Sequence, residues 1–405
     1  ASQASQASQA SQASQASQSP AAPAASLSAP AAAATANAFN PALSLILSGL
    51  YAHTSRDPAR YALSGFALPA GADIGPGTRG FSLAESELAI AANIDPWWSG
   101  SANLSLHPDD TLSVEEAWVQ TGALGNGLTL RLGRFFSSIG YLNAQHAHTW
   151  DFVDAPLAYQ AMLGTQYGDD GVRVAWLAPS DQFFEVALEL GRGRGFPGDD
   201  TGRNGAGMTA LAAHTGGDLG DSHSWRAGLS VLDTKADAQA LQSTAADGSV
   251  VGSLFAGRTR VLVADFVWKW APHGNAVRTN FKLQGEYLRS TRDGAFTYGV
   301  DAGAAPQPWR GAQSGWYLQG VYQFMPSWRL GLRTERLDPG ASGDALLGAD
   351  GWRPRRNSAM LDYSPSEFSR LRLQFGDDRA RAGAADRQLF IQYQMSLGAH
   401  GAHSY

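Results

Sequence analysis

Apolar and polar residues alternate one by one along most of this chain, and no uninterrupted apolar run is long enough to form a membrane-spanning helix. The clearest case is the segment 389–397, in which Leu, Ile, Tyr, Met and Leu occupy every second position. The same pattern recurs in 262–270, 280–288, 316–324 and 370–375. Strict alternation places the two sets of side chains on opposite faces of a β-strand. The sequence therefore predicts an all-β fold, and alternation alone leaves a soluble sandwich and a membrane barrel both open.

The number of predicted strands favours the barrel. An even number of strands is typical of single-chain bacterial outer-membrane barrels, and a tilted strand needs about 9–11 residues to cross the hydrocarbon layer. We predict about 16 strands, most of them of that length, at 43–54, 81–94, 97–107, 111–122, 127–137, 166–178, 182–192, 207–215, 223–233, 256–270, 276–290, 314–325, 327–338, 356–364, 367–376 and 387–398.

Long and short connections alternate between these strands, which is the second argument for a barrel. Outer-membrane barrels have short turns at one end and long loops at the other, whereas a sandwich has no reason to separate them. The short link at 108–110 is an exception, because a long loop is expected there. The long connections are predicted at 55–80, 138–165, 193–206, 234–255, 291–313, 339–355 and 377–386, and short ones at 95–96, 122–126, 271–275, 325–326 and 364–366.

Tryptophan gathers near the short turns, as it does at membrane–water interfaces. The residues are Trp97, Trp98, Trp176, Trp225, Trp268, Trp270 and Trp328. Charged residues make up 16% of the chain, below the roughly 25% of soluble proteins. We therefore expect a transmembrane antiparallel β-barrel of about 16 strands over residues 39–405, in contact with outer-membrane lipid.

The first 38 residues differ from the rest. Residues 1–18 repeat Ala-Ser-Gln, and an Ala, Pro and Ser-rich stretch follows. Almost no large apolar side chain is present, so burial cannot offset the entropy cost of ordering the segment. We predict a disordered, low-complexity tail over residues 1–38. A secretory leader is not visible at this end, and we expect it to have been removed.

Composition and motifs argue against several functions. The net charge of −6 and the lack of a basic block argue against nucleic-acid binding. The chain has no cysteine, which excludes a thiolate zinc site and a cysteine nucleophile. Glycine-rich stretches are not followed by a helix pattern, and no Gly-x-Ser-x-Gly motif occurs. We expect no cofactor and no enzyme; a barrel hydrolase would need a Ser or Asp–His pair at the outer rim, and none is visible.

If the apolar set faces lipid, the alternate set lines the interior and requires water there. The predicted pore-lining residues are Arg131, Arg173, Arg226, Lys282, Arg329, Arg333, Arg370, Arg372, Glu185, Glu189, Asp265 and Glu286. In one interpretation these charges only solvate the wall and pair across neighbouring strands. In the other, Arg329, Arg333, Arg370 and Arg372 form a basic ladder that attracts anions.

The third outer loop, residues 138–165, is long and rich in large side chains. Such a patch is costly to expose, and burial is available inside the barrel, where the loop would narrow the pore. We therefore predict a constriction loop that includes Tyr141, Asn143, His146, His148, Trp150, Asp151 and Asp154.

Two histidines in this loop suggest a metal site. His146 and His148 are two residues apart, so in extended backbone both imidazoles could meet one Zn²⁺ or Cu²⁺ ion, with Asp151 or Asp154 nearby. Histidines in a polar loop also cap turns or form hydrogen bonds, and this alternative stays open. His400 and His403 near the C-terminus form a weaker candidate pair.

Several segments resemble one family. They are 133–143 with His146, His148, 150–154 and Pro156, together with 40–44 and 396–403. They are similar to proteobacterial outer-membrane barrels labelled zinc-regulated TonB-dependent outer-membrane proteins, which resemble the phosphate-selective porin O and P group. The resemblance implies a sixteen-stranded trimeric pore with an inward third loop. Residues 1–38 are too simple for a plug domain, and a TonB-dependent receptor has about 22 strands, so TonB-driven uptake is not expected.

The sequence thus predicts an outer-membrane porin for passive diffusion of small hydrophilic solutes, with anions slightly preferred. The family resemblance implies that it assembles as a homotrimer. A conducting pore must release what it admits, so solute binding should be weak. Two alternatives remain: a metal-related uptake channel that uses His146 and His148, and a structural or surface barrel without transport.

Overall fold

The computed structural model describes residues 41–122, 124–199, 204–245, 248–300, 303–347 and 351–398, and the predicted tail lies outside them. Two α-helices, α1 (Leu157–Leu163) and α2 (Gly340–Leu347), and three short 3-10 helices, Pro58–Arg60, Ala147–Thr149 and Pro272–Gly274, lie in connections. The strands are β1 (Ala42–Thr54), β2 (Gly80–Leu83), β3 (Ser86–Asn93), β4 (Trp98–Leu106), β5 (Leu112–Thr121), β6 (Leu128–Phe136), β7 (Gly168–Leu177), β8 (Phe183–Gly191), β9 (Met208–Leu219), β10 (His223–Thr244), β11 (Val250–Trp270), β12 (Asn280–Tyr298), β13 (Gln307–Met325), β14 (Trp328–Asp338), β15 (Arg355–Ser366), β16 (Ser369–Arg379) and β17 (Asp386–Gly398).

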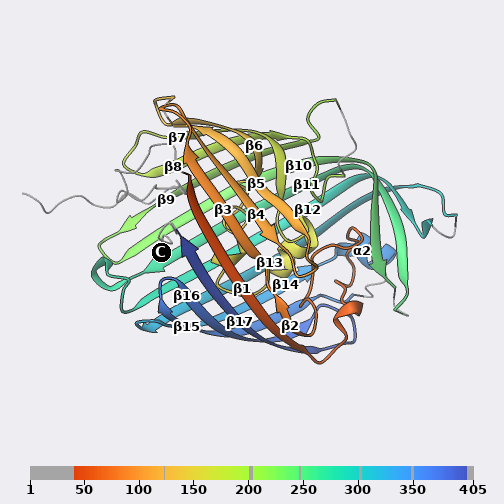
Figure 1. Ribbon diagram of the computed structural model, residues 1–405. Coiled ribbons are helices and arrows are strands. Elements are labelled where there is room, and N and C mark those ends of the chain that lie inside the picture. The colour runs from red at the N-terminus through yellow and green to blue at the C-terminus, as the bar shows by residue number, and fades with distance from the viewer. Residues whose placement is uncertain are drawn as a thin grey trace, which may run out of the picture.

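The strands form one closed antiparallel barrel (Figure 1). Each strand pairs with the next along the chain, except that β2 and β3 do not pair with each other. β1 also pairs with β17, with Ser44 opposite Gly398 and Thr54 opposite Gln388. Both β2 and β3 pair with β1, so these two segments occupy a single strand position interrupted at residues 84–85. The seventeen segments therefore fill sixteen positions, and the predicted sixteen-stranded antiparallel barrel is confirmed.

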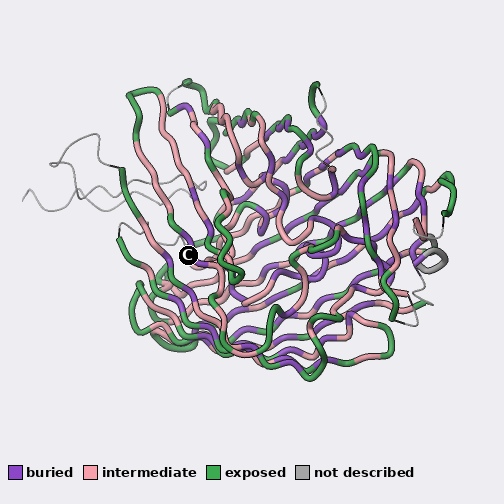
Figure 2. The backbone as a smooth tube through the Cα atoms, turned by 45° about the vertical axis from the view of Figure 1, so that its right-hand side comes forward, coloured by how far each residue is buried: buried purple, intermediate pink, exposed green. Residues whose placement is uncertain are grey.

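In the barrel wall the apolar side chains are exposed and the polar ones are buried, which is the reverse of a soluble protein. On β16 the outward side chains of Leu371, Leu373 and Phe375 are 46%, 44% and 50% exposed, whereas Arg372 and Gln374 between them are 1% exposed. Figure 2 shows the same alternation of buried and exposed positions along the strands. An apolar outer surface on a closed barrel is stable only when lipid covers it. The barrel therefore spans a membrane.

None of the helices in the described part of the chain is long and apolar enough to cross a membrane.

Short turns lie at one end of the barrel, and tryptophan marks that rim. Trp98 begins β4, Trp225 and Trp328 lie near the starts of β10 and β14, and Trp176 and Trp270 lie near the ends of β7 and β11. Because consecutive antiparallel strands reverse direction, all of these positions fall at the same end. The aromatic rim predicted from the sequence is therefore present.

Two predicted long loops are mostly strand. The segments 234–255 and 291–313 continue the ladders of β10–β11 and β12–β13, which project as hairpins beyond the rim opposite the short turns (Figure 1). The described part of the β10–β11 ladder has one irregularity, a bulge between Ala236 and Gln239. The sequence did not reveal these extensions because outside the lipid neither face needs to be apolar.

The barrel interior contains a hydrophobic core made by two loops, and only one of them was predicted to turn inward. Leu63 and Phe66, from the connection between β1 and β2, pack with Leu142 and Leu157 from the connection between β6 and β7. Wall residues Leu232, Val261, Val263 and Leu288 complete the cluster. Apolar burial therefore helps to hold both connections inside the barrel.

Candidate functional site: the barrel interior

The connection between β6 and β7, residues 137–167, lies inside the barrel. Its His146 contacts Glu115 on β5, and its Asp151 contacts Lys282 on β12. Further along, its Asp154 contacts Arg333 on β14. Strands this far apart around a closed wall can be reached by one loop only across the interior. That this loop narrows the pore stays a prediction about conductance.

Two wall carboxylates hold the start of the loop through its backbone. Glu189 on β8 accepts a hydrogen bond from the Ser138 N–H at 2.9 Å. Glu286 on β12 accepts from the N–H groups of Tyr141 and Leu142 at 3.1 and 2.9 Å. Both residues were predicted to line the pore. Their carboxylates bind the loop, so they contribute little free negative charge to the lumen.

Asn143, Tyr141 and Trp150, three predicted loop residues, have structural contacts. Asn143 bridges the two ends of the loop, because its side-chain amide donates to the carbonyls of Ser137 and Tyr167, each at 2.8 Å. Arg226 of β10 lies 5.3 Å from the centre of the Tyr141 ring. The Trp150 indole N–H donates to the Gln145 carbonyl at 2.9 Å.

Asp151 and Asp154 fasten the far part of the loop to basic residues of the wall. Lys282 Nζ lies 2.5 Å from Asp151 Oδ2, and Arg329 Nη1 lies 3.3 Å from Asp151 Oδ1. Burial opposes ionisation, but these two cations outweigh it and hold the pKa of Asp151 well below its usual range.

Asp154 has a similar setting. Arg333 Nη2 approaches its Oδ1 at 2.7 Å, and Arg356 Nη1 approaches its Oδ2 at 2.5 Å. Burial raises the pKa of Asp154, but the guanidinium groups of Arg356 and Arg333 lower it to about 2. This carboxylate is therefore ionised at neutral pH and remains an anchor of the loop.

The four arginines of the predicted ladder lie on β14 and β16, which are separated by β15, and carboxylates pair with three of them. Asp362 on β15 binds Arg329 at 2.5 Å and Arg372 at 2.7 Å, and Glu335 lies 2.8 Å from Arg333. Arg370 instead donates to the carbonyl of His148 and to the side-chain oxygen of Gln394, at 2.8 and 2.5 Å. Most of the ladder's positive charge is therefore offset locally.

Other lumen cations lack such partners. Among the described residues, no carboxylate lies within ion-pair distance of Arg131, Arg226, Lys269 or Arg370. Lys269 on β11 stands directly opposite Lys282 on β12, and Arg226 lies on the neighbouring strand β10. Like charges placed directly opposite repel. This part of the wall, Arg226 with Lys269 and Lys282, therefore carries excess positive charge.

The remaining predicted pore residues have close neighbours within the wall. Arg173 lies 3.1 Å from Glu185 and 3.7 Å from Glu189, which offsets its charge. Arg131 stands opposite Arg173 in the ladder and covers the Trp118 ring, 4.1 Å from its centre. His214 Nε2 lies 3.6 Å from Asp265 Oδ2 in a fully buried contact.

His146 and His148 face carboxylates from the wall on the β3–β5 side. His146 Nδ1 lies 3.1 Å from Glu115 Oε2 and 3.3 Å from Glu87 Oε2, while its Nε2 lies 3.0 Å from Glu116 Oε2. Burial lowers the pKa of His146, but these carboxylates raise it well above its usual value. Asp151 and Asp154, the carboxylates considered from the sequence, are bound instead to the basic residues described above.

Sequence reasoning missed several residues of this interior. Arg356 and Asp362 occupy the alternate positions of β15 whose side chains face the lumen. The alternation pattern would therefore have allowed both to be predicted. Glu115 and Glu116 are adjacent, and only a bulge allows neighbouring residues of a strand to share a face. The β4–β5 register does shift there, because Asn103 pairs with Glu116 and Leu104 with Val114. An adjacent acidic pair inside an alternating strand was the available signal.

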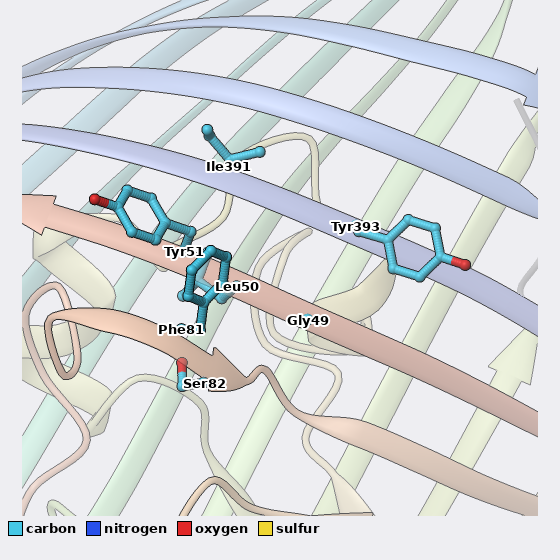
Figure 3. A pocket seen from close by; sticks show the side chains of 7 residues that line it. All are labelled: Gly49, Leu50, Tyr51, Phe81, Ser82, Ile391 and Tyr393. Atoms are coloured by element: carbon cyan, nitrogen blue, oxygen red, sulfur yellow. The ribbon is translucent and has the colours of Figure 1, made fainter.

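One shallow groove lies on the outer surface and is separate from the interior. Tyr51, Phe81, Ile391 and Tyr393 line it, on β1, β2 and β17 (Figure 3). Phe81 is 89% exposed, and the rings of Tyr51 and Phe81 are 4.9 Å apart. The groove faces the lipid side of the wall, so we assign it no solute.

Comparisons with known proteins agree with this fold. No protein-family profile matches the chain. An uncharacterised protein of Aquifex aeolicus is 28% identical over 347 residues, which cover 81% of this chain and 70% of that protein. Among solved structures, a loop L8 deletion mutant of OmpT, an outer membrane protein of Vibrio cholerae, is 10% identical and has a TM-score of 0.53, covering 89% of this chain and all of the other.

Two further structures have similar scores. The anion-selective porin from Comamonas acidovorans is 12% identical, with a TM-score of 0.53 over 88% of this chain and 99% of that one. The outer membrane channel DcaP of Acinetobacter baumannii is 12% identical, with a TM-score of 0.51 over 88% and 97%. At such low identity these similarities establish a shared fold, that of outer-membrane barrels.

Proposed function

We propose that this protein is a porin of the bacterial outer membrane that allows small hydrophilic solutes to diffuse passively. The observation that carries the proposal is the inverted wall, apolar outside and polar inside, closed into sixteen strand positions. Barrels of about this size enclose an aqueous channel, whereas eight-stranded barrels fill with side chains. The known proteins of similar fold include a porin and a channel, which supports a channel.

We further infer a modest preference for anions. Its basis is the cluster Arg226, Lys269 and Lys282 on β10–β12, in which only Lys282 has a carboxylate at ion-pair distance among the described residues. Fixed positive charge along a water-filled path raises the local concentration of anions and lowers that of cations. The Comamonas acidovorans porin of similar fold is described as anion-selective.

Planar-bilayer recording tests both proposals. Purified protein should form stable channels, and in a tenfold KCl gradient the reversal potential should have the sign of the chloride equilibrium potential. The double substitution Arg226→Gln/Lys269→Gln should move that potential toward zero. Arg289→Gln is the matched control, because Arg289 lies on β12 but is exposed on the outer side of the wall, and it should leave the potential unchanged.

The outcomes separate the alternatives. A barrel that inserts but conducts no current would favour a structural or surface role. A current with cation preference would reject the basic cluster as the selectivity determinant and leave the channel intact. A current blocked by micromolar zinc would favour a metal-related uptake channel.

Assembly as a homotrimer is part of this proposal, as is membership of the zinc-regulated family that the sequence resembles. One form of the OmpT of similar fold is described as a trimer. Native mass spectrometry in mild detergent should give three chains per particle. A single-chain particle in the intact outer membrane would reject the trimer.

A further inference from the structure

The histidines of the inward loop meet three glutamates of the wall in one cluster. Glu87 comes from β3, Glu115 and Glu116 come from β5, and His146 and His148 come from the loop. We propose that His146, Glu87 and Glu115 in this cluster bind one divalent transition-metal ion, for which Zn²⁺ is the probe. The proposal concerns binding and does not require that the barrel conduct.

The donor atoms already converge. One ligand atom from each of Glu87, Glu115 and His146 lies within 4.8 Å of the other two. Zinc binds nitrogen and carboxylate oxygen at about 2.0–2.2 Å, so two donors on a tetrahedral ion are roughly 3.3 Å apart. The distances from His146 Nδ1 to Glu115 Oε2 and Glu87 Oε2 are 3.1 and 3.3 Å. An ion would therefore need only small side-chain adjustments.

A second layer of contacts orients the donors. A metal-binding histidine usually gives its other ring nitrogen to a carboxylate, and His146 Nε2 faces Glu116 Oε2 at 3.0 Å. The Asn103 side-chain amide donates to Glu87 Oε1 at 2.9 Å, which leaves Glu87 Oε2 facing the histidines. His148 Nδ1 lies 2.8 Å from that same Oε2. Glu116, Asn103 and His148 are thus positioning residues.

The backbone of β5 is shaped so that two acidic residues face the loop. At the register shift between β4 and β5, Glu115 is the extra residue, because its neighbours Val114 and Glu116 pair with Leu104 and Asn103. Bulges re-aim side chains and are frequent next to functional sites. Without this bulge, alternation would direct one of the two carboxylates into the lipid.

Charge also favours a cation here. Among the described residues, no Lys or Arg lies within ion-pair distance of Glu87, Glu115 or Glu116. The basic side chains at that distance are those of His146 and His148. Three converging carboxylates repel one another, and a divalent ion offsets that repulsion. The His146 and Glu115 side chains are 16% and 13% exposed, so water and an ion can reach the cluster. Mixed imidazole and carboxylate donors suit zinc and neighbouring first-row metals.

Isothermal titration with Zn²⁺ in detergent tests the site. The background protein carries His400→Ala/His403→Ala, which removes the second pair of histidines. We expect the background protein to bind one zinc ion per chain. Zinc affinity should be at least a hundredfold weaker in His146→Ala. In Glu116→Gln, which leaves the three donors in place, it should be 10–100-fold weaker. His53→Ala, an exposed histidine on β1, is the matched control and should bind like the background.

Two results would overturn the proposal: no zinc binding by the background protein, or equal affinity in the background and in His146→Ala. Glu115→Gln keeps the test decisive if His146→Ala fails to fold, because the amide has nearly the same shape and is a poorer ligand. Undiminished binding in Glu115→Gln would equally reject the site. If the protein conducts but does not bind zinc, the metal site is rejected and the porin function stands. If it binds zinc but conducts no current, the porin function is rejected and the metal site stands.

Discussion

Buried ion pairs in the lumen hold single side chains in place with little freedom to change. Asp362 is an example, because its carboxylate is fully buried and pairs with Arg329 and Arg372 at 2.5 and 2.7 Å. Removing one member of such a group leaves buried charge without compensation, which costs about 3–5 kcal/mol. An exposed pair contributes only about 0–1 kcal/mol.

Asp362→Asn should therefore lower the stability of the barrel by about 3 kcal/mol, measured by urea unfolding in detergent. Asp338→Asn is the control, because Asp338 pairs with Arg353 at 3.0 Å but is 54% exposed, and it should change stability by less than about 1 kcal/mol. Equal effects of the two substitutions would contradict this interpretation of the lumen network.

The pH dependence of loop anchoring should follow Asp154. Its pKa falls from 3.8 to about 2 in the folded barrel. A lowered pKa stabilises the fold fully above the unfolded value, and the stabilisation disappears as pH falls from about 4 to 2. The shift corresponds to roughly 2 kcal/mol.

The difference in unfolding free energy between wild type and Asp154→Asn measures this contribution, because other carboxylates titrate in both proteins and cancel. The difference should be constant above about pH 5 and shrink toward pH 2. A difference that grows as pH falls would have the wrong sign and would show that Asp154 is not held ionised by Arg356 and Arg333.

Among the larger elements, the inward loop has the most direct functional prediction. Deleting residues 143–154 removes the segment whose side chains reach both sides of the interior. Single-channel conductance should rise, because the cross-section open to water increases. Deleting 299–306, the connection between β12 and β13 at the same end of the barrel, should leave conductance unchanged. Equal conductance of all three proteins would show that the loop does not limit passage.

The strands were predictable from the sequence because lipid enforces strict alternation, and β16 and β17 begin and end within three residues of the prediction. The projecting parts of β10–β13 were not predictable, since water on both sides removes the need for an apolar face. Alternation also carries no information on which residues of distant strands meet. The contacts of His146 with Glu87 and Glu115 join separate parts of the chain, so only the folded barrel reveals them.

The inward turn of the first loop was missed for a related reason. Leu63, Phe66 and Leu68 are spread along a connection that also contains many Gly, Pro and polar residues. The loop between β6 and β7 has a denser run of large side chains, which made its burial predictable. The apolar content of one loop alone does not show whether it folds into the barrel, because another loop can supply the other half of the core.

For the whole molecule, we predict that residues 39–405 fold without the tail. Residues 1–38 contain almost no large apolar side chain, so they cannot contribute much burial to the barrel. A chain that begins at residue 39 should refold into detergent with the same yield and the same heat-resistant mobility on gels as the full chain. A marked loss of yield would show that the tail takes part in folding.

Pairing of β1 with β17 sets the order in which this molecule can be made. The partner of the first strand is the last one to leave the ribosome, so the ring stays open until synthesis is complete. The wall residues against which both inward loops pack come from several strands of the ring, so their packing is complete only when the ring closes. Assembly therefore demands a final sealing step between the two ends of the barrel.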